Sequence, residues 1–204
     1  VKKIIGLAGI AGLFLGVILA FARELSNNTF RTPDLLEDKI KVPVLGITQL
    51  VKKNKLSVTP EKQYLDNSRT PFAESINTIR TGLIFSNIDK PPQTILITSS
   101  TGAEGKSTLA LNLAVAFSNI GKTLLLEVDL RKPSVAKNLQ IKNTKGLTDI
   151  LSNSVKKMDE VIVTKNDGRL NILCCGTIPQ DPMELLSSNK FEKLLATLQA
   201  HYEY

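Results

Sequence analysis

The order of apolar and polar residues divides the chain into an uncharged N-terminal segment and a longer region of short elements. Residues 4–22 carry no charge, and about 20 apolar residues let a helix cross the hydrocarbon of a bilayer. Short apolar runs at 94–98, 123–128 and 170–174 predict strands buried on both faces. Between the first two, apolar residues recur at helical spacing as far as Gly121, which predicts a left-handed helix end. The pattern therefore predicts an α/β domain with a parallel sheet, preceded by one transmembrane helix.

Small residues build the loop between the first predicted strand and its helix. The stretch 98–114 reads TSSTGAEGKSTLALNLA, so that strand, loop and helix follow in this order. A loop closing onto a helix N terminus aims backbone N–H groups at one point, where the helix dipole also favours negative charge. Gly102 and Gly105 let the backbone curl around a phosphate group. The loop therefore predicts a P-loop NTPase-like, three-layer fold.

The first residues of the helix carry the chemistry. We expect Lys106 to reach the β- and γ-phosphates, Ser107 to offer its hydroxyl to Mg²⁺, and Thr108 to lie beside the α-phosphate. The usual pattern begins with a glycine, and Ser100 stands at that position here. Because the structural context is otherwise complete, we predict that the loop binds ATP with Mg²⁺.

Acidic residues follow the second predicted strand. Glu127, Asp129 and Arg131 lie at or just beyond its end, on the edge where open α/β sheets bind ligands. A carboxylate at this edge can hold Mg²⁺ directly or through water. We therefore expect Asp129 to share a metal site with Ser107.

Together the two motifs resemble those of the bacterial tyrosine kinases of capsular and exopolysaccharide export. In that family two Asp residues, one residue apart, follow the second strand and are associated with Mg²⁺ and with activating the attacking hydroxyl. Asp129 matches the second of them, and Glu127 replaces the first. Partition and division-site ATPases share the fold but carry a lysine where Thr101 stands. The resemblance implies the catalytic residues Lys106, Asp129 and Glu127. It implies a nucleotide site made of Gly102, Ala103, Glu104, Gly105, Lys106, Ser107, Thr108 and Arg131.

The apolar N-terminal segment has two interpretations. Lys2 and Lys3 before an apolar core, with Ala-x-Ala at 20–22, also fit a cleaved secretory signal. The core is longer than in most signal peptides, and secretion would take the nucleotide site away from ATP. Arg23 and further basic residues follow the segment, as expected for a cytoplasmic flank. We predict a transmembrane helix at 1–23 in the bacterial inner membrane, with the phosphate-binding loop in the cytoplasm.

A juxtamembrane segment and linker are predicted at 24–70. Glu24, the amphipathic stretch 33–39 and the run VPVLG at 42–46 resemble the cytoplasmic exit of the second transmembrane helix in polysaccharide chain-length determinants. Residues 51–70 are rich in Lys, Asn and Ser, which indicates a flexible linker. The net charge of +7 suits contact with membrane lipid. Because the basic residues lack interleaved aromatic side chains, we do not expect nucleic acid as a partner.

The next predicted helix carries a possible assembly motif. The stretch 70–87 reads TPFAESINTIRTGLIFSN. Members of the family carry Glu-x-x-Arg-x-x-Arg on this helix and use it to pack kinase domains into a ring. Glu74 and Arg80 match this motif, while Asn77 replaces the first Arg, whose planar charged group an amide cannot reproduce. The resemblance implies a homo-oligomeric ring formed through this helix.

The last third of the chain predicts a strand and a capped helix pair. The adjacent residues Cys174 and Cys175 point to opposite faces of the strand, which predicts buried reduced thiols. Asp181 before Pro182 predicts a helix N-cap. In the family a further strand then ends in an Asp that holds Mg²⁺ through water, and a tyrosine-rich tail follows. We therefore expect 71–204 to be a kinase-like domain with an incomplete sheet, in a fragment of a longer polypeptide or a decayed gene. By itself it is expected to bind ATP weakly and phosphorylate little or nothing.

Two functions stay open on the sequence alone. The first is a membrane-anchored tyrosine autokinase that passes the γ-phosphoryl group of ATP to tyrosine hydroxyls. It would regulate polysaccharide chain length and export, with the export and polymerisation machinery as partner. The second is a polysaccharide copolymerase whose nucleotide-binding domain is a scaffold, with ATP as a structural or regulatory ligand.

Overall fold

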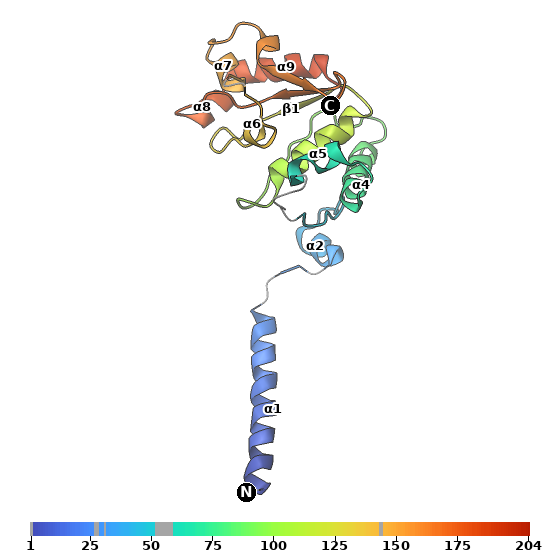
Figure 1. Cartoon of the computed structure of the whole chain (residues 1–204), viewed down its shortest axis with the longest axis vertical. Coiled ribbons are helices and arrows are strands. Elements are labelled where there is room, and N and C mark those ends of the chain that lie inside the picture. The colour runs from blue at the N-terminus through green and yellow to red at the C-terminus, as the bar shows by residue number, and fades with distance from the viewer. Residues whose placement is uncertain (1, 27–28, 31, 52–58, 143–144) are drawn as a thin grey trace. The chain divides into compact units, whose positions relative to one another are not determined.

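The computed structural model describes residues 2–26, 29–30, 32–51, 59–142 and 145–204. Its contacts divide the chain into two compact units, Val1–Val44 and Leu45–Tyr204. The first unit contains helices α1 (Lys2–Leu25) and α2 (Pro33–Ile40), and the other described elements belong to the second (Figure 1). Residues from Leu45 onward therefore pack with the second unit, although the sequence suggested a linker as far as residue 70.

Helix α1 is apolar between charged ends. Within it, Lys3–Leu25 is long and apolar enough to cross a membrane. Its most apolar stretch of 18 residues has a mean hydropathy of 2.6 and is not buried by the rest of the chain. In α2, Pro33 occupies the first turn and Lys41 ends the helix with a φ of 56°. The Glu37 carboxylate then accepts a hydrogen bond of 2.6 Å from the Val44 N–H.

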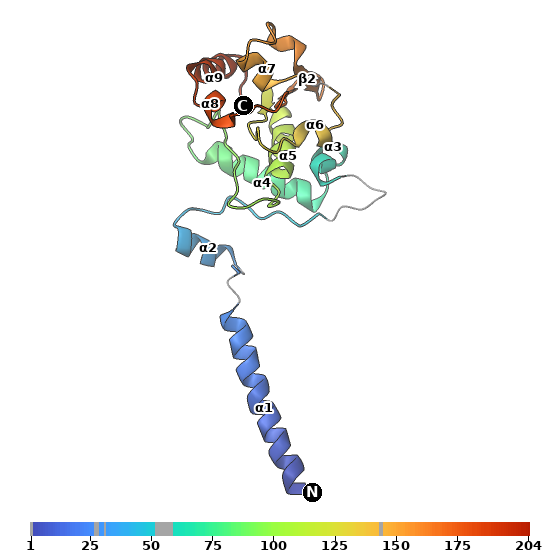
Figure 2. The same cartoon turned by 90° about the vertical axis from the view of Figure 1, so that its left-hand side faces the viewer.

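Helix α5 (Lys106–Ser118) is the centre of the second unit. All side chains from Leu111 to Ser118 are buried, and a helix that is apolar all round has to be enclosed. It contacts α4 (Pro71–Phe85), the short elements η1 (Pro60–Lys62) and α3 (Gln63–Asp66), and strand β1 (Thr123–Leu126). Figure 2 shows α5 behind α6 (Val135–Asn138) and close to α4.

The sheet is mixed rather than parallel. Its order is β1-β3-β2, with β3 (Leu170–Leu173) parallel to β1 and antiparallel to β2 (Ile162–Lys165). Two of the predicted strands are confirmed by β1 and β3. Strand β2 was not predicted. The turn after it does carry a sequence signal, because Asn, Asp and Gly at 166–168 favour the positive φ angles of tight hairpins. All three residues have positive φ in the structure.

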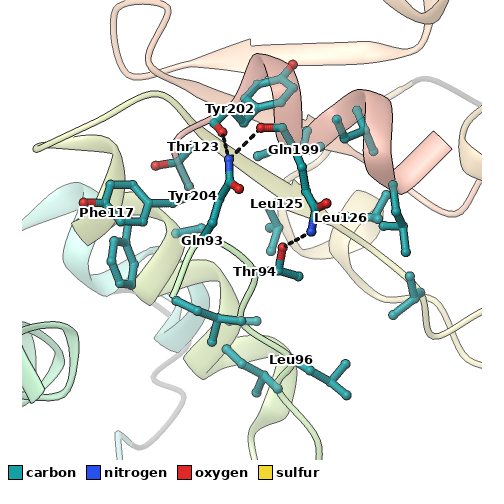
Figure 3. Close-up of a pocket in the computed structure, with 18 of the residues that line it drawn as sticks. Gln93, Thr94, Leu96, Phe117, Thr123, Leu125, Leu126, Gln199, Tyr202 and Tyr204 are labelled. Carbon is teal, nitrogen blue, oxygen red and sulfur yellow. Dashed lines mark hydrogen bonds between the residues drawn. The ribbon is translucent and has the colours of Figure 1, made fainter. Parts of the chain in front are cut away.

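The predicted strand at 94–98 is wrong, since this segment pairs with no strand among the described residues. An apolar pocket of about 480 Å³ separates 94–97 from β1 (Figure 3). Leu96 is 77% exposed. Strand conformation requires a neighbour for the backbone N–H and C=O groups, and the pocket lies where that neighbour would be. Side chains hold the segment instead: Gln93 Nε2 donates to the carbonyls of Gln199 and Tyr202 at 2.6 and 2.7 Å (Figure 3).

Part of the predicted flexible linker is folded. Tyr64 on α3 is buried against α5, where the fully buried side chain of Asn112 holds its backbone. Its Oδ1 accepts from the Tyr64 N–H at 2.9 Å, and its Nδ2 donates to the carbonyls of Pro60 and Thr108 at 2.9 and 2.7 Å. One side chain thus satisfies backbone groups of two segments that are distant in sequence. Residues 52–58 of that linker lie outside the described residues.

The end of α5 differs from the predicted left-handed glycine. The helix ends at Ser118, and Gly121 does not have a positive φ. Instead, a Cβ at Gly121 would come within 2.8 Å of the side chains of Glu203 and Tyr204. Glycine therefore lets these two side chains approach the backbone closely here. Beside it, the Leu124 N–H donates to the Tyr204 carbonyl at 2.9 Å.

The remaining helices cover the sheet and its ends. They are α6, α7 (Leu147–Leu151), η2 (Met158–Glu160), α8 (Pro182–Leu186) and α9 (Asn189–His201). The predicted N-cap is confirmed, because Asp181 Oδ1 accepts from the N–H groups of Met183 and Glu184 at 2.9 and 3.1 Å.

A buried carboxylate fastens α7 to the chain after β3. Asp149 Oδ2 accepts from the N–H groups of Gly146 and Thr177 at 2.8 and 3.1 Å, and Oδ1 from the Thr177 hydroxyl at 2.8 Å. Burial by itself would raise the pKa of Asp149, but these hydrogen bonds outweigh it and hold the pKa below its ordinary value. The charged form is therefore the one that stabilises the fold.

We expect Asp149→Asn to lower the free energy of unfolding by about 2 kcal/mol at pH 7, because an amide cannot accept from all three donors. Since the folded-state pKa is depressed, this contribution is present above the unfolded pKa and is lost as pH falls through the folded pKa. The difference between variant and wild type should therefore shrink below about pH 4. Urea unfolding at several pH values measures it, with Asp159→Asn as an exposed control. A difference that does not change with pH would contradict the assignment.

Candidate active site

The phosphate-binding loop enters α5 through residues with positive φ. Gly105 is the N-cap, with a φ of 87°, and Ala103 has a φ of 65°. Glycine adopts this conformation without strain, whereas alanine does so at a cost. Left-handed residues next to a helix start turn successive N–H groups toward one side, which makes an anion-binding concavity. Lys106 and Ser107 form the first turn of α5 and are half-buried.

A carboxylate within the loop ties it together. Glu104 accepts from the Ser100 hydroxyl at 3.0 Å and from the Thr101 hydroxyl at 2.9 Å and N–H at 3.3 Å. The hydrogen bond from the Thr101 N–H is the main cause that lowers the pKa of Glu104. Ser100, which replaces the usual first glycine, therefore contributes a hydroxyl to the closed loop. Sequence spacing did not indicate this role.

A pocket of about 490 Å³ borders the loop, a size that suits a small-molecule ligand. Loop residues 103–106 form one part of its lining, and Thr48–Val51, Phe72 and Ile97 form others. Residues 45–51 reach this position because they pack on α4. There, Gly82 leaves room for Leu45, and a Cβ on Gly46 would come within 2.7 Å of Ile79. The segment that follows α2 in the sequence thus lines the candidate nucleotide pocket.

The structure places Lys106 and Ser107 in the first turn of α5 and brings Asp129 to the Lys106 side chain. The Lys106 ammonium lies 3.7 Å from Asp129 Oδ2, and both side chains remain accessible, at 33% and 41%. Such a pair is worth at most about 1 kcal/mol, so phosphate can displace it. Asp129 Oδ1 accepts from the Lys132 N–H at 3.1 Å, which orients the carboxylate.

The donors at this place fit Mg²⁺ carried by a nucleotide. Ser107 and Asp129 offer a hydroxyl and a carboxylate, the hard oxygen ligands that Mg²⁺ takes together with phosphate oxygens. Within the described residues no group of three or more His, Cys, Asp or Glu side chains is arranged to hold a metal.

Two of the predicted site residues are placed differently from these three. Glu127 is 6% exposed, and backbone N–H groups occupy its carboxylate: those of Ser134, Val135 and Cys175, at 2.6, 2.8 and 3.1 Å. Arg131 is exposed beyond β1. Ser134 was not predicted from the sequence, yet its hydroxyl donates to Ser107 Oγ at 3.0 Å.

The helix predicted to assemble a ring makes contacts within its own chain. Arg80 Nη1 donates to the Ala116 carbonyl of α5 at 2.7 Å, and the Tyr64 hydroxyl donates to Asn77 Oδ1 at 2.7 Å. Glu74 is exposed on α4. Arg80, a predicted assembly residue, and Asn77, which departs from the motif, thus stabilise the contact of α4 with its neighbours α5 and α3.

Known proteins are similar to this chain in sequence and in architecture. The chain is 40% identical to the tyrosine-protein kinase YwqD of Bacillus subtilis over 132 residues, 64% of this chain and 55% of the relative. It is 33% identical to a putative tyrosine-protein kinase, CapB of Staphylococcus aureus, over 74% of this chain and 66% of the relative. The crystal structure of the chimerical protein CapA2B2 matches with a TM-score of 0.76 and 31% identity, over 85% of this chain and 73% of that one. The chain belongs to the bacterial tyrosine kinase family.

Further comparisons agree with the fold. The kinase domain of the Escherichia coli tyrosine kinase ETK matches with a TM-score of 0.71 at 23% identity, over 85% of this chain and 71% of that one. No protein-family model matches the sequence. The chain spans between half and two thirds of the length of the two curated relatives named above.

Glu127 also acts on the two cysteines, which are free and buried as predicted. Burial, with a smaller contribution from the Glu127 carboxylate, raises the pKa of the Cys174 thiol to about 12 and that of Cys175 to about 11. Because the thiolate is the reactive form, both thiols are protected in the folded chain.

We expect an aromatic disulfide reagent at pH 8 to leave the folded chain unmodified and to label both cysteines once urea unfolds it. A Ser152→Cys variant, whose added thiol is at an exposed position, provides the control and should react within minutes. Rapid labelling of the native wild type would contradict the burial of these thiols.

Proposed function

We propose that this domain binds Mg²⁺ and ATP at the phosphate-binding loop, and that the protein containing it transfers the γ-phosphoryl group to tyrosine hydroxyls. The observation that carries the proposal is the ion pair between Lys106 and Asp129 at the start of α5, where Lys106 also lines the loop pocket. Phosphoryl transfer depends mainly on positioning and on neutralising charge. An ammonium, a hydroxyl and a carboxylate at a helix N terminus are suited to that task.

Each residue has a stated part in this proposal. The N–H groups of 102–108, together with Arg131, hold the phosphates, and Lys106 leaves Asp129 to neutralise charge on the β- and γ-phosphates. Ser107 and Asp129 hold Mg²⁺, which supplies further charge neutralisation when bound. That Glu127 activates the attacking hydroxyl stays a prediction.

The cellular setting follows from α1 and from the relatives. We propose that α1 anchors the protein in the bacterial inner membrane, with the loop in the cytoplasm where ATP is available. The basic residues after α1 would face anionic lipid. Control of polysaccharide chain length and export, with the export machinery as partner, and a ring formed through Glu74 and Arg80, are the remaining parts of the proposal.

One observation favours a second function. The carboxylate of Glu127 is engaged by backbone groups, so the acid that its position suggests for activating a hydroxyl is occupied. A nucleotide-binding copolymerase that uses ATP as a regulatory ligand would need Lys106 and Ser107 but no such acid. The two functions differ in whether phosphotyrosine forms.

We expect Lys106→Met to weaken ATP binding about 100-fold and to abolish phosphotyrosine in the intact natural protein, because a charge-assisted contact to phosphate is lost. Calorimetry with Mg²⁺ and ATP measures binding, and an anti-phosphotyrosine blot measures transfer. Lys122→Met is the matched control, since Lys122 is an exposed lysine that stacks on Tyr202. Wild-type ATP binding without any phosphotyrosine would favour the regulatory function, and absence of ATP binding would overturn both.

A further inference from the structure

Ser134 stands at a helix start but does not cap it. It is the N-cap residue of α6, a position where serine usually accepts from an N–H one turn along. Here its side chain makes no capping hydrogen bond. Its hydroxyl instead donates across to Ser107 Oγ on α5, at 3.0 Å in a half-buried place. The hydroxyl is therefore available to the first turn of the phosphate-binding helix.

Glu127 performs the capping that Ser134 does not. Its Oε1 accepts from the N–H groups of both Ser134 and Val135, and its Oε2 accepts from the N–H of Cys175 after β3. The carboxylate thus joins the chain after β1 to the start of α6 and to the neighbouring strand. This arrangement fixes the backbone of Ser134, from which its hydroxyl reaches Ser107.

We propose that Ser134 is a positioning residue for the Ser107 hydroxyl when that hydroxyl binds Mg²⁺, and that Glu127 holds Ser134 in place. This proposal rests on the proposed function. A hydroxyl that gives a lone pair to a cation directs its proton to another acceptor, and Ser134 Oγ is the partner that the structure provides. The hydrogen bond then reverses its direction, and Ser107 keeps one rotamer with its lone pair toward the metal.

The length of Glu127 is part of this arrangement. An aspartate here would end about 1.5 Å shorter, the length of one C–C bond, and could not keep its contacts with both α6 and the Cys175 N–H. The family that the chain resembles has an aspartate at this position, so this chain differs from it by one methylene group in the side chain. In this proposal Glu127 acts on the metal site through Ser134.

The first test measures ADP binding by calorimetry to the full chain in detergent micelles, with Mg²⁺ and with EDTA. Ser134→Ala should reduce the affinity in Mg²⁺ about tenfold, the lower end of the effect of losing a partner that orients a metal ligand. The affinity in EDTA should stay unchanged. Ser134→Thr keeps the hydroxyl and should restore the Mg²⁺ effect, and Ser152→Ala, an exposed serine elsewhere, should match wild type. Equal losses with and without Mg²⁺ would overturn the proposal, as would no loss at all.

The second test concerns Glu127, and its first measurement needs no nucleotide. Glu127→Asp should speed amide hydrogen exchange at Ser134 and Val135 at least tenfold relative to amides of α9, because their acceptor is lost. It should also reduce the Mg²⁺ effect on ADP affinity as Ser134→Ala does. If exchange is unchanged, or if Glu127→Asp strengthens the Mg²⁺ effect, Glu127 does not position Ser134.

These outcomes are separate from those of the proposed function. A wild-type chain that binds no ADP in either condition would overturn nucleotide binding and, with it, the role of Ser134 toward the metal. In that case the exchange measurement still decides whether Glu127 holds the start of α6. A chain that binds ADP with an unchanged Mg²⁺ effect in Ser134→Ala would overturn the positioning role alone.

Discussion

Enclosure of helix α5 on both sides is the constraint on which the site depends. Strand β1 packs on one side of the helix and α3 and α4 on another, and its side chains from Leu111 to Ser118 are buried. Any sliding or rotation of α5 would expose apolar surface at about 25 cal/mol per Å². Polar contacts limit the movement further, since Asn112 fixes the chain at Pro60 and Tyr64, and Arg80 donates to the carbonyl of Ala116. The N terminus of α5, which carries the lysine and serine of the loop, is therefore held by packing that lies away from it.

Buried carboxylates perform the same task at the ends of the strands. After β1 and β3 the backbone leaves the sheet, and its N–H groups lose their ladder partners. Each acid accepts from one N–H after β3 and from one at a helix start: Glu127 from Cys175 and Ser134, Asp149 from Thr177 and Gly146. A carboxylate can accept several hydrogen bonds at once, which suits it to a place where chain segments meet. Because both acids are nearly buried, their hydrogen bonds also offset the cost of taking a charge out of water.

Local sequence patterns predicted the structural features that are determined by residues close together in the chain. The phosphate-binding loop, the helix after it, the cap at Asp181 and the two buried strands beside Glu127 could all be read from sequence, because spacing and composition decide them. The missing strand pairing at 94–98 could not be predicted from the sequence. An apolar run indicates that a segment is buried, but it does not indicate which strand it pairs with. Nor could the folding of Pro60–Lys62 be predicted, because it depends on Asn112, about 50 residues further along the chain. The role of Ser134 could not be predicted either, because its contact joins two helices and a sequence pattern indicates only that it lies at a helix start.

The segment 94–98 shows why the loop needs its own internal bonds. It leads directly into the phosphate-binding loop, but it is held at its start by side chains, with Gln93 bonded to carbonyls near the end of α9, and Ile95 and Ile97 rest against the core. A ladder would restrain every residue along the segment, while these contacts leave Leu96 exposed. The C-terminal end of the loop is therefore fixed by α5, whereas its N-terminal end is held by a few contacts of the segment 94–98. The hydrogen bonds of Glu104 with Ser100 and Thr101 connect the weakly held entrance of the loop to its end near α5. The shape of the loop before phosphate binds therefore depends on a carboxylate, and a bound phosphate would compete with this carboxylate for the same donors.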